Sequence, residues 1–228
     1  MAIIMAPSNP DLLPIIFSVA LISLIPFAVI TMTSFLKIAV VLFLLRSALG
    51  TQQTPPSLVL YAITLVLSLY VSAPVVMAGF KAASLAAGPA SLDHLPTLIR
   101  VGTAALGPER HFLVRFAKPH EVAFMQHAAV RLWPPGEAPK LGASNMLVLV
   151  PAFVISQLTS AFEIGFLIYL PFIAIDMIIS TVLMAMGMVM VSPQVISTPF
   201  KLFVFVLVSG WSTLLHGLIL GYATHGGF

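Results

Sequence analysis

The chain contains no cysteine, and only 7% of its 228 residues are charged. The first absence excludes a disulfide framework and a metal site built on thiolates. The second excludes an ordinary soluble domain, in which about 25% of residues carry charge. No run of basic residues occurs and the formal net charge is only +3, so no nucleic-acid partner is expected.

Apolar residues fill most of the chain: they make up 60% of it, and the mean hydropathy is +1.10. Long apolar runs without secretory-signal features are typical of membrane helices, because a helix satisfies all of its own backbone hydrogen bonds in lipid. We therefore predict an all-α, multi-helix integral membrane protein built of helical hairpins. A small, mainly helical extramembrane domain is expected between the second and third apolar runs.

Residues 1–80 form the predicted N-terminal apolar hairpin region. The first apolar run, residues 12–30, follows a segment without lysine or arginine, so it does not resemble a cleaved secretory signal and is expected to be retained. Pro26 inside it is expected to kink or end the helix. The apolar stretch at residues 38–45 is too short to span a membrane. It is expected to extend the first helix or to lie at the membrane interface.

The predicted extramembrane domain, residues 81–144, holds 11 of the 17 charged residues and four of the six histidines. It follows a turn at residues 50–56 and a second apolar run at residues 57–80. Residues 111–132 have apolar positions near helical spacing, which predicts a helix. Gly107-Pro108 is expected to mark a loop.

The orientation follows from the short basic loop. Lys37 and Arg46 flank a segment with no acidic residue, which predicts that residues 37–57 lie on the cytoplasmic side. Residues 81–144 then lie on the opposite side. Their own basic excess argues the reverse, but segments longer than roughly 60 residues translocate largely regardless of charge.

The C-terminal apolar region, residues 145–228, contains three apolar runs, at residues 145–170, 171–191 and 199–222. Charged side chains inside such runs are costly, so each is expected to face a partner or a cavity. Ser156, Ser160 and Glu163 are spaced to share one helical face. Asp176 and Lys201 are the available partners for that face, in the same chain or in a neighbouring copy.

Four methionines, Met184, Met186, Met188 and Met190, precede a proline-marked break at Ser192-Pro193. Methionine is flexible and fills irregular gaps, so the residues alone support both ordinary core packing and a soft apolar plug. Further along, Gly217 and Gly221 have a small-xxx-small spacing, which permits close helix approach but often occurs by chance.

The residues carry no recognisable catalytic constellation. His120-Glu121 begins like a zinc-protease helix, but Phe124 stands where the second histidine is required. No enzyme activity, cofactor or metal is therefore expected. A second hypothesis is an ion- or proton-coupled small-solute transporter that uses Glu163 and Asp176. Such a protein is expected to show inverted repeats with interrupted helices, and the sequence has none that we can detect.

Five collinear blocks resemble one family: MTSFLK, LLRSALGTQQTPP, PAFVISQLTSAFEIGF, IDMIISTVLMAMGMVMVSP and PFKLFVFVLVSGW. They are similar to the FliP/SctR family, core subunits of the export apparatus of bacterial flagella and type III secretion injectisomes. The match covers residues 32–80 and 145–217. The lack of a signal sequence and the short central domain favour the injectisome branch.

The resemblance implies a non-enzymatic pore subunit of the bacterial inner membrane, with the central domain in the periplasm. Five copies would assemble with FliQ/SctS-like and FliR/SctT-like subunits around a closed conduit for unfolded secretion substrates, next to a FlhB/SctU-like switch subunit. The apolar helices would pack largely into that assembly.

The family's methionine-rich constriction maps onto Met186, Met188 and Met190, with Met184 one turn before Met188. Three positions depart from the family pattern. Val189 stands where another methionine is common, Gln157 where an acidic residue is frequent, and Ser209 where aspartate precedes Gly-Trp.

Overall fold

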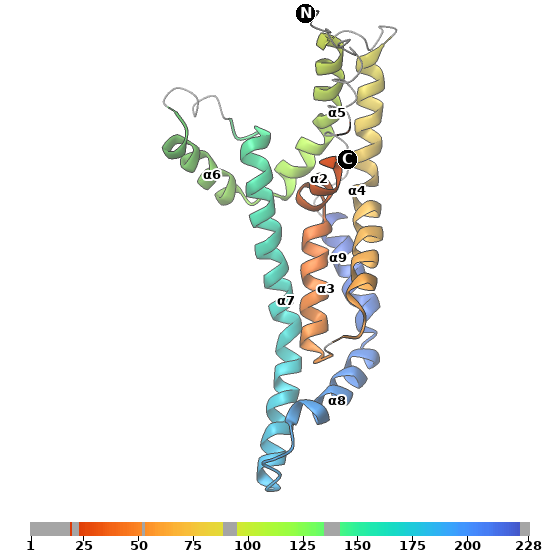
Figure 1. The fold of residues 1–228 in the computed structure, drawn as a ribbon, viewed down its shortest axis with the longest axis vertical. Coiled ribbons are helices and arrows are strands. Elements are labelled where there is room, and N and C mark those ends of the chain that lie inside the picture. Colours follow the sequence, from red (N-terminus) through yellow and green to blue (C-terminus); the bar gives the residue numbers. More distant parts are fainter. Residues whose placement is uncertain (1–18, 20–22, 52, 89–94, 135–141, 224–228) are drawn as a thin grey trace, which may run out of the picture.

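The computed structural model describes residues 19, 23–51, 53–88, 95–134 and 142–223, and within these residues the regular secondary structure is helical (Figure 1). The expectation of an all-α, multi-helix membrane protein is confirmed. The helices are α2 (Ile25–Met32), α3 (Phe35–Ala48), α4 (Ser57–Ala87), α5 (Leu95–Phe116), α6 (Pro119–Leu132), α7 (Met146–Ala185), α8 (Pro193–Leu207) and α9 (Gly210–Ala223).

The helices form an elongated bundle organised around α3. Figure 1 shows α3 between α4 and the long α7, with α5 beside the upper part of α4 and α6 leaving the bundle on the other side of α7. Beyond the lower tip of α7 the chain reverses into α8, and α9 then runs back up the bundle. The tip between α7 and α8 therefore lies far from α5 and α6.

Two helices, α4 and α7, are long and apolar enough to cross a membrane. Two bent pairs qualify if each counts as one span: α2 with α3, bent by 70°, and α8 with α9, bent by 60°. The second bend corrects the expectation of a single run at residues 199–222. It is centred on Ser209, which has a φ of 50°, a value that is uncommon for a residue other than glycine.

Residues 38–45 do not continue α2 as one straight helix. These residues belong to α3, which turns away from α2 and lies in the core. Ile38, Val41, Leu42 and Leu45 are fully buried. Lys37, which precedes them, places its Nζ 4.9 Å from the centre of the Tyr222 ring. A helix too short to span lipid is thus buried by the rest of the protein.

Three apolar clusters follow one another along α7, and the second and third also contain residues of α3. They draw in α4, α5, α8 and α9 from distant parts of the chain. Their buried members are, in turn, Val71, Val75, Phe112, Leu113, Ala117, Leu149, Phe153 and Tyr222; Ile38, Val41, Leu42, Leu60, Ala161 and Leu218; and Leu45, Ala48, Leu49, Phe172 and Phe205.

Several prolines lie inside helices. The predicted boundary at Pro171 is wrong, because α7 continues through Pro151 and Pro171 for 40 residues. Likewise α5 continues through Pro108, so the predicted loop at Gly107-Pro108 is also wrong. In α7, which is apolar enough to cross a membrane, breaking the helix would leave more backbone groups unpaired than the one that proline removes. Pro26 stands in the first turn of α2, where its missing N–H costs little.

The helical character predicted for residues 111–132 is confirmed, with a break that the sequence analysis did not place. α5 ends at Phe116 and α6 begins at Pro119. Lys118 has the extended conformation (ψ 131°) that a following proline favours. The preceding helix α4 runs without interruption past residue 80 to Ala87, so the polar domain starts on the same helix that carries the second apolar run.

Candidate functional site

The methionine cluster lies at the lower tip of the molecule, on the last turn of α7 and the loop that leads to α8 (Figure 1). Its four side chains are exposed: Met184 by 62%, Met186 by 64%, Met188 by 44% and Met190 by 99%. Val189 between them is also exposed, by 82%. These side chains are therefore not core filler of this chain.

Gly187 shapes the tip. Its φ of +75° is in the left-handed region that glycine adopts without penalty. Around it, the amide of Met188 donates to the carbonyl of Leu183 (2.9 Å) and the amide of Gly187 donates to that of Met184 (3.0 Å). This pair of hydrogen bonds is the Schellman motif that ends many helices. The sequence thus terminates α7 at a defined point and presents the following methionines on a loop.

Lys201 and Asp176 join α8 to α7 above this tip. Lys201 Nζ donates to Asp176 Oδ2 at 2.6 Å and to the carbonyl of Ala48, at the end of α3, at 3.2 Å. The lysine side chain is 4% exposed, whereas that of Asp176 is 41% exposed. Both border a cavity of about 630 Å³ between α7 and α8. One buried ammonium group thus holds together three helices close to the methionine loop.

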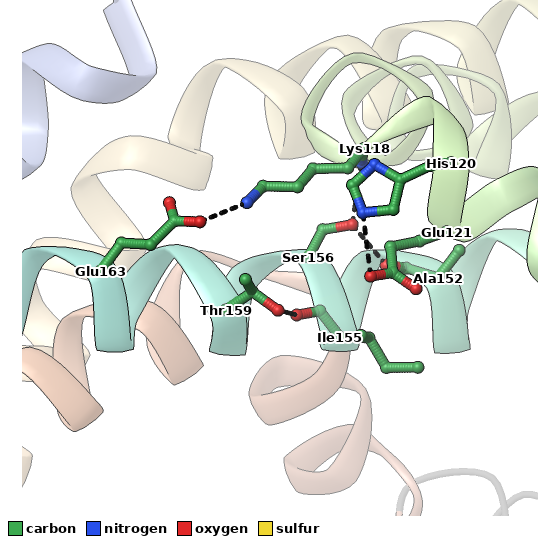
Figure 2. A network of polar contacts seen from close by, with 8 residues as sticks. All are labelled: Lys118, His120, Glu121, Ala152, Ile155, Ser156, Thr159 and Glu163. Carbon is green, nitrogen blue, oxygen red and sulfur yellow. Dashed lines mark hydrogen bonds and ion pairs between the residues drawn. The ribbon is translucent and has the colours of Figure 1, made fainter.

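The predicted polar face of α7 is used at the junction of α5 and α6, which Figure 2 shows. Ser156 Oγ accepts from the amide of Lys118 (2.8 Å) and donates to the carbonyl of Ala152 (2.6 Å). Lys118 Nζ donates to Glu163 Oε1 at 2.9 Å. Ser160 lies one turn beyond Ser156 and is half-buried.

Within the chain, Glu163 thus pairs with Lys118 and with neither of the partners considered from the sequence. Asp176 and Lys201 pair with each other instead. The structural reason is the length of α7: without a break at Pro171, the 13 residues from Glu163 to Asp176 separate them by about 20 Å along the axis. The signal for Lys118 was weak, because a single lysine before a proline does not identify its partner.

Sequence reasoning noted Gln157 only as a departure from a family pattern. The structure buries it, and its side-chain Nε2 donates to the carbonyl of Phe116 (3.1 Å). The hydroxyl of Tyr222 donates to Gln157 Oε1 at 2.6 Å. Gln157 therefore ties α7 to the end of α5 and to α9, and a neutral amide suits this position because it offers both a donor and an acceptor.

The close helix approaches occur at other glycines than Gly217 and Gly221. At both of those positions an added Cβ would meet nothing within 4 Å among the described residues. At Gly165 of α7 it would lie 2.2 Å from Leu44 Cδ1, and at Gly79 of α4 2.9 Å from the carbonyl oxygen of Ala105. Gly217 is exposed and Gly221 is half-buried, so the small-xxx-small pair makes no close helix contact among the described residues.

Within the described part of the chain, no three histidine, aspartate or glutamate side chains are grouped to hold a metal ion. His120 Nε2 lies 3.2 Å from Glu121 Oε1, and the imidazole is exposed. The Glu121 side chain is half-buried, and these two side chains form a local pair rather than part of a ligand set.

The fold and these contacts define an all-helical membrane protein with two long apolar helices and an exposed methionine loop. The chain belongs to the FliP family, whose model matches residues 18–218. It is 46% identical over 214 residues to the Yop proteins translocation protein R of Yersinia pestis. The matched region covers 93% of this chain and 97% of that protein.

Two further relatives come from other bacteria. The hypersensitivity response secretion protein HrcR of Ralstonia nicotianae is 42% identical over 94% of this chain and 99% of its own length. The virulence protein YscR of Salmonella typhimurium is 42% identical over 95% of this chain and 99% of its own length. The resemblance found in the sequence is confirmed, and these relatives have the translocation, secretion and virulence names of the injectisome branch.

Proposed function

We propose that this chain is a core subunit of a type III protein export apparatus in the bacterial inner membrane. Membership of the FliP family supports this, as do the names of the relatives, which describe translocation and secretion. In this proposal the protein does no catalysis. It forms part of a sealed conduit for unfolded secretion substrates.

One observation supports the proposal that the methionines form a gate. The methionines of the α7–α8 loop are exposed at the tip of the molecule and have no other described segment packed over them. Repeated around a ring, Met186, Met188 and Met190 would converge as an apolar collar, with Met184 on the helix behind them. A hydrophobic constriction blocks ions by dewetting. Unbranched thioether side chains part around a passing polypeptide and close again behind it.

Exposed apolar surface supports assembly into such a ring. Large side chains are exposed along α4, α7 and α8, among them Tyr70, Phe166 and Phe203, and contiguous patches of this kind mark contacts with protein or membrane. We propose five copies, in contact with FliQ/SctS-like, FliR/SctT-like and FlhB/SctU-like subunits. Residues 81–144 would face the periplasm, because the turn between α3 and α4, which follows the basic Arg46, is expected on the cytoplasmic side, and α5 and α6 lie toward the other end of the bundle (Figure 1).

The test is the triple variant Met186→Ala, Met188→Ala, Met190→Ala in the assembled apparatus. Alanine shortens the collar, so ion conductance across cells that carry the variant should rise while assembly is retained. The matched control is Met77→Ala with Met177→Ala, which shortens exposed methionines of α4 and α7 outside the loop. A correctly assembled triple variant without added conductance would refute the gate.

The alternative, a coupled transporter that uses Glu163 and Asp176, is not favoured by the geometry. Each carboxylate pairs with its own lysine, and about 20 Å of helix separates them. A proton relay needs groups within hydrogen-bond reach of one another or of a bridging water. The two carboxylates therefore act as two separate inter-helix contacts.

A further inference from the structure

A groove of about 390 Å³ runs between α2, α4 and α5, on the side of the bundle away from the methionine loop. Its walls are aliphatic and aromatic, and the small side chains among them leave space between the helices. Its lining residues are Ile25, Ala28, Val29, Met32, Thr33, Val75, Val76, Gly79, Phe80, Ala83, Ala105, Leu106 and Glu109. An apolar groove of this size suits a hydrocarbon chain better than a polar ligand.

Glu109 of α5 is the one carboxyl group in this lining. Its Oε1 atom is buried and has no hydrogen-bond partner among the described residues. Burial raises the pKa of the Glu109 carboxyl to about 7, because the apolar surroundings disfavour the charged form. The groove thus provides an unsatisfied acceptor at the edge of an apolar channel, and its lining provides no lysine, arginine or histidine to pair with it.

The groove lies where the membrane boundary is expected. The second apolar run ends at Phe80, which lines the groove, and the next residue, Lys81, is exposed. α4 qualifies as a membrane span, whereas α5 does not. We therefore expect Glu109 near the level of the phospholipid headgroups, with the apolar part of the groove extending along α2 and α4.

We propose that the groove binds one acyl chain of a phospholipid with a primary amine headgroup, and that Glu109 accepts a hydrogen bond from the headgroup ammonium. This inference does not depend on the gate. An ammonium group both donates a hydrogen bond and neutralises the carboxylate, and such charge-assisted bonds are the stronger kind. An anionic headgroup would be repelled, and a quaternary ammonium has no N–H to donate.

Residues 1–24 of the chain do not supply this partner from their side chains, because they contain no lysine, arginine or histidine. A basic side chain from another subunit would satisfy the carboxylate equally well, and the experiment has to separate that occupant from a lipid.

The test is lipid binding to the purified full-length protein in detergent, measured by native mass spectrometry. The probes are phosphatidylethanolamine, phosphatidylcholine and phosphatidylglycerol with identical acyl chains. At pH 8 the wild type should bind phosphatidylethanolamine about tenfold more tightly than either of the others, as a charge-assisted hydrogen bond would give. Glu109→Gln should remove most of this preference, and Ala83→Phe, which fills the groove, should weaken binding of all three lipids.

Glu121→Gln is the control, since it removes a carboxylate that lies on α6 outside the groove. The pH dependence of the wild type tests the proposal even if a variant does not fold. The preference should fall between pH 8 and pH 5.5, because Glu109 becomes protonated as the pH drops through its raised pKa. The residues of α2 in the lining are not ionisable, and the nearest charged side chains on α4 and α5, Lys81 and Arg110, are exposed.

Equal affinity of the wild type for the ethanolamine and choline lipids would overturn the proposal. An unchanged preference in Glu109→Gln would do the same. If the lipid is bound by single chains but is absent from the assembled apparatus, the groove is a contact between subunits and the lipid assignment is wrong.

Discussion

The ammonium nitrogen of Lys201 lies 2.6 Å from Oδ2 of Asp176, but the two side chains differ tenfold in exposure, at 4% and 41%. The lysine is enclosed by α3, α7 and α8, whereas the carboxylate borders the cavity between α7 and α8. The same ion pair is thus buried at one end and hydrated at the other. Its two members cannot be equivalent in their effect on stability.

We expect Asp176→Asn to be the more harmful change of the two. It leaves the buried ammonium without its counter-ion and should cost about 2–3 kcal/mol, less than the about 3–5 kcal/mol of a fully buried pair because Asp176 is partly hydrated. Lys201→Met leaves a carboxylate that water can reach, so it should cost less. Thermal unfolding in detergent gives the comparison, and the double variant should be more stable than Asp176→Asn alone. Greater destabilisation by Lys201→Met would contradict this account.

Glu163 and Ser156 lie on one face of α7, but we expect their substitutions to differ in effect. Loss of Ser156 should lower the stability of the single chain, whereas loss of Glu163 should lower the yield of the oligomer. The exposed pair of Glu163 with Lys118 should contribute less than about 1 kcal/mol to folding. Ser156→Ala leaves the amide of Lys118 unpaired and should cost about 1–3 kcal/mol. If Glu163 also pairs with a neighbouring copy, Glu163→Ala lowers the oligomer yield on native electrophoresis without lowering the unfolding temperature of the monomer. Unchanged oligomer yield would exclude that contact.

Gly187→Ala should loosen the methionine loop. The added Cβ would meet none of the described residues within 4 Å, so the expected cost is conformational, about 1–2 kcal/mol for a side chain at positive φ. We expect faster proteolysis in the loop of the variant. Gly142→Ala is the control, because that glycine also has open space around it and has no positive φ. Equal cleavage rates for both variants would show that the Gly187 turn is not needed.

Gly165→Ala should destabilise the contact of α3 with α7 by about 1–3 kcal/mol, since its Cβ would overlap Leu44. Leu44→Ala in the same chain should restore part of that loss by making room. Gly217→Ala should leave the unfolding temperature of the monomer unchanged, because that position is open. If Gly217 contacts a second helix in the assembly, its substitution lowers only the oligomer yield. Failure of Leu44→Ala to rescue Gly165→Ala would refute the proposed overlap.

Single cysteines should show the orientation cleanly, because the chain has no cysteine of its own. Gln53→Cys is in the exposed turn between α3 and α4 and should react with reagents only from the cytoplasmic side. Gly107→Cys on α5 should react from the periplasmic side. Reaction of Gly107→Cys with cytoplasmic reagent alone would invert the proposed topology.

The sequence by itself determined the class of the protein and its helices. Scarce charge and long apolar runs require helices in a membrane, and collinear sequence blocks were enough to recognise the FliP family. It also marked a helix break at Ser192-Pro193, directly after the methionines. The end of α7 at Ala185 was not predicted, because the sequence analysis did not use Gly187 as a helix terminator. All of these features depend on residues that are neighbours along the chain.

Tertiary structure alone decided where the helices end around internal prolines and which charges meet. Prolines usually break a helix in water, but α7 continues through Pro171 in an apolar environment and α5 continues through Pro108 while packed against α4. The partner of Glu163 is Lys118, 45 residues away, and this pairing depends on the corner between α5 and α6. A contact of that range is set by how helices pack against each other, which the spacing of residues along one helix does not encode.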